Sequence, residues 1–304
     1  MGLIRITIDP ACTDKLRIEE FIAHVEQHVD LSCAEGLAES APHFRKLAND
    51  VDLIPSYFNR AIKKFLDHSP LAAYTPQSVF LVAGRGFFLR ANIWTPLKLS
   101  ENFRSQEERV FSYRNTHDHN FHFMTVGYHG PGYETNLYQY DPSRVRGYIG
   151  EVVELESLGR TMLQVGRVMV YREKVDVHTQ FPPEQLSVSL NLMVTKKREC
   201  EPDQYFFDPS DGRIVEMPQI ALVHKRASIV ALAGQLANSD TADVIESLII
   251  DAPCRRVREA ALVAASTLRE LSAGERLRLI ELGADDRDEV VRFRARSMVA
   301  ERTV

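Results

Sequence analysis

The spacing of apolar side chains changes twice along this chain, from a helical period to alternation and back again. Before residue 77, apolar side chains recur every three or four positions, as they do on one face of a helix. This spacing predicts helices over residues 13–28, 35–49 and 55–68. An alternating run over residues 1–9 predicts one short strand or an ordered tail. The segment 1–76 is therefore expected to be mainly helical.

Between residues 77 and 222 apolar residues alternate with polar ones, which is the pattern of strands with one buried face. Strands are predicted over residues 79–82, 87–94, 117–126, 133–140, 145–149, 151–158, 167–171 and 186–194. Gly, Pro and Asp turns separate them without amphipathic helices, so antiparallel pairing is favoured. The pattern predicts an α+β protein with an antiparallel barrel or double sheet at its centre.

Helical spacing returns in residues 223–304, which are rich in Ala, Leu and Arg. Five helices are predicted, over residues 227–237, 241–250, 254–271, 273–282 and 288–301. Val257-Arg258 and Val291-Arg292 stand 34 residues apart and each precede alanines, so this region resembles helical repeats of the HEAT type. An ordinary helical cap on the barrel is the alternative. The region is expected to hold no catalytic group and to offer an association surface, through which a homo-oligomer could form.

Composition narrows the classes of function. The 304 residues carry a formal net charge of −5, which argues against a nucleic-acid partner because phosphate binding relies on clustered Lys and Arg. The four cysteines have no C-x-x-C spacing, so neither a zinc ribbon nor a disulfide framework is predicted. The first residues lack the apolar core of a signal peptide, and no apolar run is long enough to span a membrane. A cytoplasmic protein without a membrane partner is expected.

Histidines concentrate in the alternating region, where five of the chain's ten lie between residues 117 and 178. His117 and His119 stand two positions apart, so on one strand both side chains would project to the same face. His178 falls in the polar turn predicted between the last two strands. Neutral imidazole is the commonest metal ligand among side chains. The pattern indicates a metal site, with a solvated or core pair of histidines as the alternative.

These histidines and their surroundings resemble the cupins, and within them the branch that includes cysteine dioxygenase. The resembling stretches are THDHNFHF, which contains His117 and His119, and VMVYREKVDVHTQFPPEQLSVSLNLMV, which contains His178. The likeness covers about residues 78–195 and implies a jelly-roll barrel in which the three histidines hold one ferrous ion, Fe(II). Many cupins add a Glu where this chain has Phe123 and Met124, and thiol dioxygenases often carry a Cys there. The chain departs from both at this point.

Four further residues are candidates for the site. The resemblance implies that Arg90, 27 residues before His117, anchors a substrate carboxylate, for which a guanidinium is well suited. A surface Arg is the alternative. Tyr128 is a candidate catalytic residue, and His122 and Glu134 are candidates for binding a second iron or for orienting the ligands by hydrogen bonds. His122 has the wrong parity to face inward unless its strand bulges, and one iron is favoured over two.

Three ligands on one side of a metal leave positions for a substrate and dioxygen. The favoured function is therefore an iron-dependent oxygenase, either a dioxygenase or a hydroxylase, that uses O2 on a small carboxylate-bearing molecule such as an amino acid. A non-oxidative isomerase or lyase, in which the metal acts only as a Lewis acid, is the second hypothesis. The third is a ligand-binding or regulatory protein whose helical tail meets a partner. Metal identity and oxygen consumption separate the first two.

Overall fold

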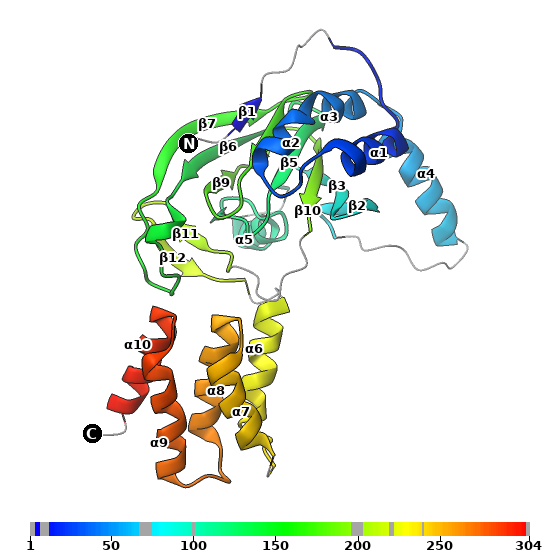
Figure 1. Ribbon diagram of the computed structural model, residues 1–304. Coiled ribbons are helices and arrows are strands. Elements are labelled where there is room, and N and C mark those ends of the chain that lie inside the picture. The colour runs from blue at the N-terminus through cyan, green and yellow to red at the C-terminus, as the bar shows by residue number, and fades with distance from the viewer. Residues whose placement is uncertain are drawn as a thin grey trace. The chain divides into compact units, whose positions relative to one another are not determined.

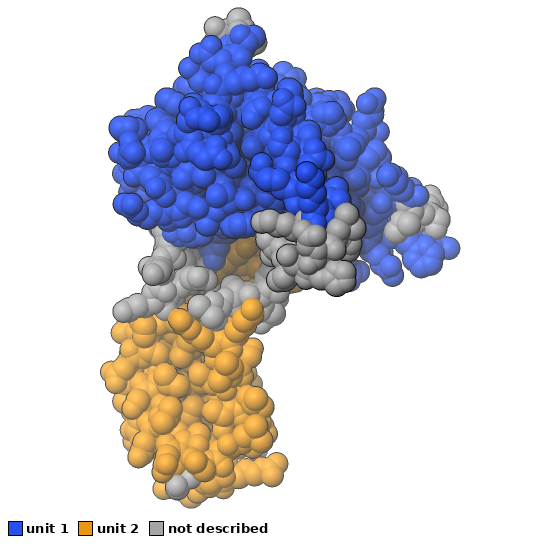
Figure 2. All heavy atoms as spheres, turned by 90° about the vertical axis from the view of Figure 1, so that its right-hand side faces the viewer, with its two compact units in different colours: residues 1–143, 152–196, 206–213 blue, residues 144–151, 197–205, 214–304 orange. Residues whose placement is uncertain are grey.

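The computed structural model describes residues 4–6, 12–66, 75–98, 101–195, 203–218, 222–238 and 240–301. The chain divides into two compact units (Figure 2), one of residues 1–143, 152–196 and 206–213, the other of residues 144–151, 197–205 and 214–304. The strands, apart from residues 214–216, belong to the first unit, and the second unit is mainly helical. The predicted α+β class is confirmed. None of the described helices is both long and apolar enough to cross a membrane.

Six strands form each sheet in the described residues. The first sheet has the order β1, β8, β5, β10, β3, β2, with bounds Ile4–Ile6, Val168–Tyr171, Phe123–His129, Ser187–Val194, Phe87–Trp94 and Ser78–Gly84. The second has the order β12, β11, β4, β9, β6, β7, with bounds Arg213–Glu216, Phe206–Asp208, Thr116–His117, Asp176–Gln180, Tyr133–Gln139 and Glu156–Leu163. The strands form two separate sheets, so the double sheet is correct and the closed barrel is not. Of the strand predicted over residues 1–9, the part outside β1 lies outside the described residues.

The sequence did not reveal two of the places where the chain passes from one sheet to the other. The predicted strand 117–126 is wrong, because β4 ends at His117 in the second sheet and β5 begins at Phe123 in the first. Residues 118–122 form this first crossing. Residues 172–175 form a second crossing, from β8 to β9, so His178 lies in a strand and not in the predicted turn. Helix α5 (Glu101–Val110) lies between two of the predicted strands, where only turns were expected.

Helices cover the outer face of the first sheet (Figure 1). They are α1 (Ile18–His28), α2 (Ala34–Glu39), α3 (Ala41–Ala48) and α4 (Leu53–Leu66). Phe21 and Phe44 from the helices share one apolar cluster with Met124 and Leu192 from the strands. The helix predicted over 35–49 is split at Ser40, because Pro42 has no N–H to continue the helical hydrogen bonds. Residues 67–68 of the third predicted helix lie outside the described residues.

The inner faces of the two sheets pack against each other. Trp94 of β3 lies against Tyr133 of β6, with ring centroids 4.1 Å apart. Alternation along the strands also turns polar side chains to this interior. Thr125 donates a hydrogen bond to Asn191 Oδ1 at 2.6 Å, and Ser189 donates to the same oxygen at 3.2 Å. The space between the sheets therefore combines aromatic rings with buried hydrogen-bonding groups.

Five helices are described in the helical unit. They are α6 (Leu222–Ala233), α7 (Thr241–Asp251), α8 (Arg255–Thr267), α9 (Ala273–Leu282) and α10 (Glu289–Ala300). The two arginines of the 34-residue echo occupy equivalent positions: Arg258 donates to the carbonyl oxygen of Ala252, and Arg292 to that of Asp286, each six residues earlier. Arg258 also binds the Asp286 carboxylate through two nitrogens, at 2.7 and 3.0 Å. A HEAT-type repeat remains an interpretation of this region.

Candidate metal centre

Three imidazole rings converge in the space between the two sheets. His117 on β4 and His178 on β9 are directly paired in the ladder of the second sheet. His119 follows in the first crossing. The Nε2 atom of His178 lies 3.2 Å from Nε2 of His117 and 3.1 Å from Nε2 of His119. All three residues are buried, and among the described residues they are the one group of three His, Cys, Asp or Glu side chains close enough to hold a metal ion.

These two separations match the distance between neighbouring nitrogen ligands of one ion. Nitrogens that bind a metal at about 2.1 Å, with angles between the octahedral and tetrahedral values, lie about 3.0–3.4 Å apart. Without an ion, three nitrogen lone pairs pointing at one another would repel unless protons lay between them. His117 Nδ1 lies 2.9 Å from the carbonyl oxygen of Asn115, so it is positioned to donate there and leave the Nε2 lone pair facing inward. The donor set therefore fits a metal ion.

Gln180 completes the surroundings of His178. Its amide nitrogen lies 3.1 Å from His178 Nδ1 and 3.0 Å from His178 Nε2, while its Oε1 atom is buried without a partner. The amide therefore lies against the His178 ring and restricts its rotation. Gln180 shares a face of β9 with His178, and sequence reasoning missed it although the spacing of two was readable.

Burial keeps the three rings neutral. Loss of hydration lowers the pKa of His117, although the Asn115 carbonyl and Asp118 oppose this shift. Desolvation holds the pKa of His119 well below its usual value, and the neighbouring His117 and His178 lower it further. Desolvation and then His117 do the same to the pKa of His178. Because only neutral imidazole has a lone pair to give, the site is ready to bind a cation near neutral pH.

Aromatic rings surround the histidines. His117 stacks against Phe206 with ring centroids 5.3 Å apart. Phe123 lies edge-on to His119 at 4.6 Å, and Tyr171 lies edge-on to His178 at 4.8 Å. These rings restrict the rotation of the ligands and exclude water from their sides.

Arg90 lies on the inner face of β3. It lowers the pKa of both His117 and His119, as a nearby positive charge does. Burial lowers the pKa of Arg90 itself to about 10, with Tyr133 opposing the shift. Its Nε atom is buried and has no hydrogen-bond partner. The predicted candidate is thus a partly buried Arg in the middle of β3, with its Nε atom buried, and not a surface Arg at a strand end.

Unpartnered polar atoms gather around the same interior. Five buried side-chain nitrogen or oxygen atoms in the described residues have no hydrogen-bond partner, and four of them belong to Arg90, Asn92, His119 and Gln180. Arg90 and Asn92 share a face of β3, and His119 and Gln180 belong to the metal-binding group and its support. Buried polar groups without partners are costly, and they mark places where a ligand or ordered water supplies the missing bonds. Sequence reasoning missed Asn92, which stands two positions from Arg90.

The other three predicted site residues lie away from this group. Tyr128 points to the outer face of β5, where its hydroxyl donates to the Asp50 carbonyl at 3.0 Å. Glu134 faces outward on β6 and pairs with Arg160 at 3.1 Å, with about half of its side chain exposed. His122 Nδ1 accepts a hydrogen bond from the Glu173 amide at 2.9 Å. Among the described residues, the structure brings together the three histidines alone, and Tyr128, Glu134 and His122 do not belong to that group.

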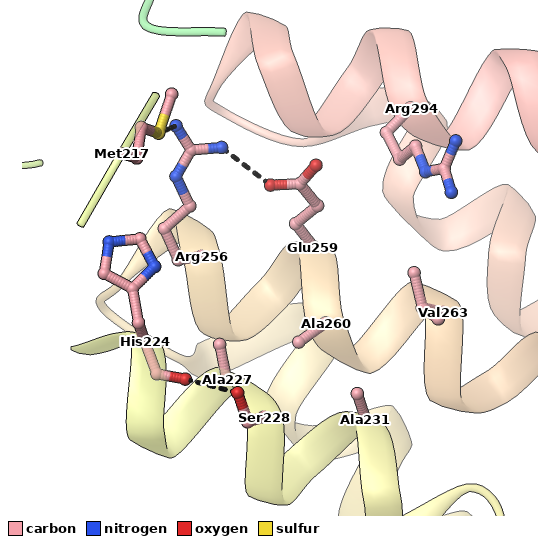
Figure 3. Close-up of a pocket in the computed structure, with 10 residues that line it drawn as sticks. All are labelled: Met217, His224, Ala227, Ser228, Ala231, Arg256, Glu259, Ala260, Val263 and Arg294. Carbon is pink, nitrogen blue, oxygen red and sulfur yellow. Dashed lines mark hydrogen bonds and ion pairs between the residues drawn. The ribbon is translucent and has the colours of Figure 1, made fainter. Parts of the chain in front are cut away.

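The helical unit contains a pocket (Figure 3). It has a volume of about 420 Å³ and is lined by Met217, His224, Ala227, Ser228, Ala231, Arg256, Glu259, Ala260, Val263 and Arg294. Arg256 binds Glu259 at 2.8 Å and Asp203 at 3.0 Å, and the Ser228 hydroxyl donates to the His224 carbonyl. Most of its polar groups are thus satisfied within the protein. The histidine group, which has unpartnered atoms around it, is the stronger candidate.

Comparison with known proteins adds little to this geometry. No protein-family model matches the chain, and no curated protein matches its sequence. Among solved structures, the hydroquinone 1,2-dioxygenase PnpCD in complex with Cd2+ and 4-hydroxybenzonitrile is similar at 12% identity, over 41% of this chain and 68% of that one, with a TM-score of 0.27. The hydroquinone 1,2-dioxygenase from Sphingomonas sp. TTNP3 with 4-hydroxybenzoate bound is similar at 11% identity, over 42% and 70%, with a TM-score of 0.28. A cupin domain from Bordetella pertussis Tohama I reaches 12% identity, over 41% and 100%, with a TM-score of 0.23. TM-scores this low define neither the fold nor the activity of this chain.

Proposed function

We propose that this chain is a metal-dependent oxygenase of the cupin type that acts on a small anionic molecule. The observation that carries the proposal is the buried group of His117, His119 and His178, in which Nε2 of His178 lies 3.1–3.2 Å from the other two Nε2 atoms. Three neutral nitrogen donors on one side suit iron, copper, nickel or zinc. The resemblance of the motif to the cupins supports iron. When bound, a ferrous ion would supply positions at which a substrate and O2 react side by side.

The substrate is proposed to bind through the unpartnered groups near the histidines. Arg90 provides a partly buried positive charge whose buried Nε atom lacks a partner, and Asn92 Oδ1 provides an acceptor on the same face of β3. A carboxylate accepts from the guanidinium, and an amino or hydroxyl group donates to the amide oxygen. Trp94, Tyr133 and Tyr171 exclude water from this space. These features support a small amino or hydroxy carboxylate.

Replacing Arg90 by methionine is expected to raise the KM for such a substrate at least about 10-fold, because a hydrogen bond to a charged group contributes about 1.5–3 kcal/mol. Metal content should not change. The free energy of unfolding should stay the same or rise, since an incompletely paired buried guanidinium costs free energy. Steady-state kinetics and thermal unfolding measure the two effects. Arg85→Met, on the exposed turn before β3, is the matched control. An unaltered KM in Arg90→Met would remove Arg90 from the substrate site.

The proposed function is tested by metal analysis of anaerobically purified protein, followed by oxygen consumption on a panel of amino, hydroxy and aromatic carboxylates. About one iron per chain and substrate-dependent oxygen uptake are expected. A protein that binds no metal when supplied with ferrous iron would contradict the proposal. Turnover of a substrate without oxygen uptake would instead support the second candidate, a non-oxidative isomerase or lyase, which the same neutral three-histidine set could serve with zinc.

A further inference from the structure

The three histidines are not held in place by the same means. His117 and His178 sit opposite each other on paired strands, so the ladder of the second sheet sets their separation. His119 lies in the first crossing, outside any strand, and no ladder hydrogen bond positions it. Another contact must hold its main chain if its imidazole is to face the other two.

That contact comes from the second crossing. The Lys174 amide donates to the His119 carbonyl oxygen at 2.8 Å. The ammonium group of the same lysine binds Asp118, the residue next to His119, at 2.5 Å. The Asp118 side chain is fully buried and also accepts from the Tyr140 hydroxyl at 2.6 Å. The main chain of Lys174 thus holds His119, and its side chain holds the preceding residue, Asp118.

The backbone of Lys174 supports this assignment. Its φ angle is +57°, in the left-handed region that residues other than Gly, Asn and Asp seldom adopt. A residue kept in such a conformation is held there by its surroundings. Here the conformation lets the amide reach His119 while the side chain reaches Asp118. A buried ion pair and a strained backbone at one residue are more than a simple turn between two sheets requires.

We propose that Lys174 is a positioning residue that converts a two-histidine pair into a three-histidine metal site. The proposal rests on the metal centre proposed above. The two crossings run side by side between the paired residues His117–His178 and Phe123–Tyr171, and Lys174 joins them. Without its ammonium group the first crossing loses its charged anchor, and the His119 ring is no longer fixed toward the ion. His117 and His178 keep their ladder pairing.

The test is a titration of metal-free protein with Co(II), whose visible absorption reports coordination. Lys174→Met is expected to bind cobalt about 10–100-fold more weakly, as seen when groups that support ligands are removed. The absorption of its cobalt complex should also change in shape, because one nitrogen donor is lost. Lys174→Arg, which keeps the positive charge, should regain part of the affinity.

Loss of stability must be separated from loss of positioning, because Lys174→Met leaves Asp118 without its charged partner. The double variant Asp118→Asn, Lys174→Met removes both charges and should recover thermal stability, yet still bind cobalt weakly. Arg258→Met, which breaks a buried ion pair with Asp286 in the helical unit, is the matched control and should bind cobalt as the wild type does. If the wild type binds no cobalt, the metal centre itself is wrong. If it binds cobalt and the lysine variants bind it equally well with the same spectrum, the role of Lys174 alone is wrong.

Discussion

Replacing His178 by alanine is expected to weaken metal binding at least about 100-fold, so that dialysed protein retains no stoichiometric metal. His178 is the shared neighbour in the group, since its Nε2 atom is the one placed at 3.1–3.2 Å from both other Nε2 atoms. Its loss leaves two nitrogens without the donor between them. Metal per chain, measured after dialysis against a weak chelator, checks the expectation. Turnover should disappear together with the metal.

Two controls make this result specific. His178→Gln keeps most of the side-chain volume, so its loss of metal cannot be ascribed to a cavity in the interior. His129→Ala removes an exposed histidine at the end of β5 and should keep the wild-type metal content. A His178→Ala protein that still holds one metal ion per chain would show that the ion binds elsewhere.

The second large effect is a loss of stability of the metal-free protein in mild acid. The pKa values of His117, His119 and His178 are lowered in the folded state by burial, while in the unfolded chain they return to about 6.5. The unfolded state therefore binds more protons below pH 6.5, and stability falls as the pH decreases. Three such groups contribute up to about 4 kcal/mol per pH unit to the free energy of unfolding.

Urea unfolding of the metal-free protein between pH 5 and 8 measures this dependence. Trp94 is the single tryptophan of the chain and is buried between the sheets, so its fluorescence reports on this unit. His24, His43 and His224 also have a lowered pKa through burial and contribute their own share. The comparison is therefore with a variant in which His117, His119 and His178 are all glutamine. Equal pH dependence in the two proteins would contradict the assignment of neutral buried rings.

A bound metal ion should reduce this loss of stability in mild acid. Protons and the ion compete for the same lone pairs, so affinity falls as the pH drops through the pKa values of the folded, metal-free site. These pKa values lie below the ordinary value for histidine, so the metal should remain bound at pH 6.5 and leave in more acidic solution. Titration of bound cobalt with acid follows its release.

Several features of this protein were readable from sequence alone. The period of apolar residues reports which side of an element is buried, so the helical start, the strand-rich centre and the helical end were predicted correctly in kind. The three histidines of the site could be named because two stand two residues apart and the third lies in a strand-rich segment that resembles a known motif. The prediction that His117 and His119 share one strand was wrong, because β4 ends at His117 and His119 lies in the first crossing.

Tertiary structure decided the rest. The point at which the chain enters a new sheet decides which face each later residue of that strand occupies. For this reason Tyr128 faces the helices, although it follows the histidines closely in the sequence. Burial decided the character of Arg90, because a guanidinium has the same sequence signature in water and in a closed interior. The contact between Lys174 and Asp118 joins residues 56 positions apart. No local pattern records such a pair, because it exists only when two crossings are brought together by the pairing of their flanking strands.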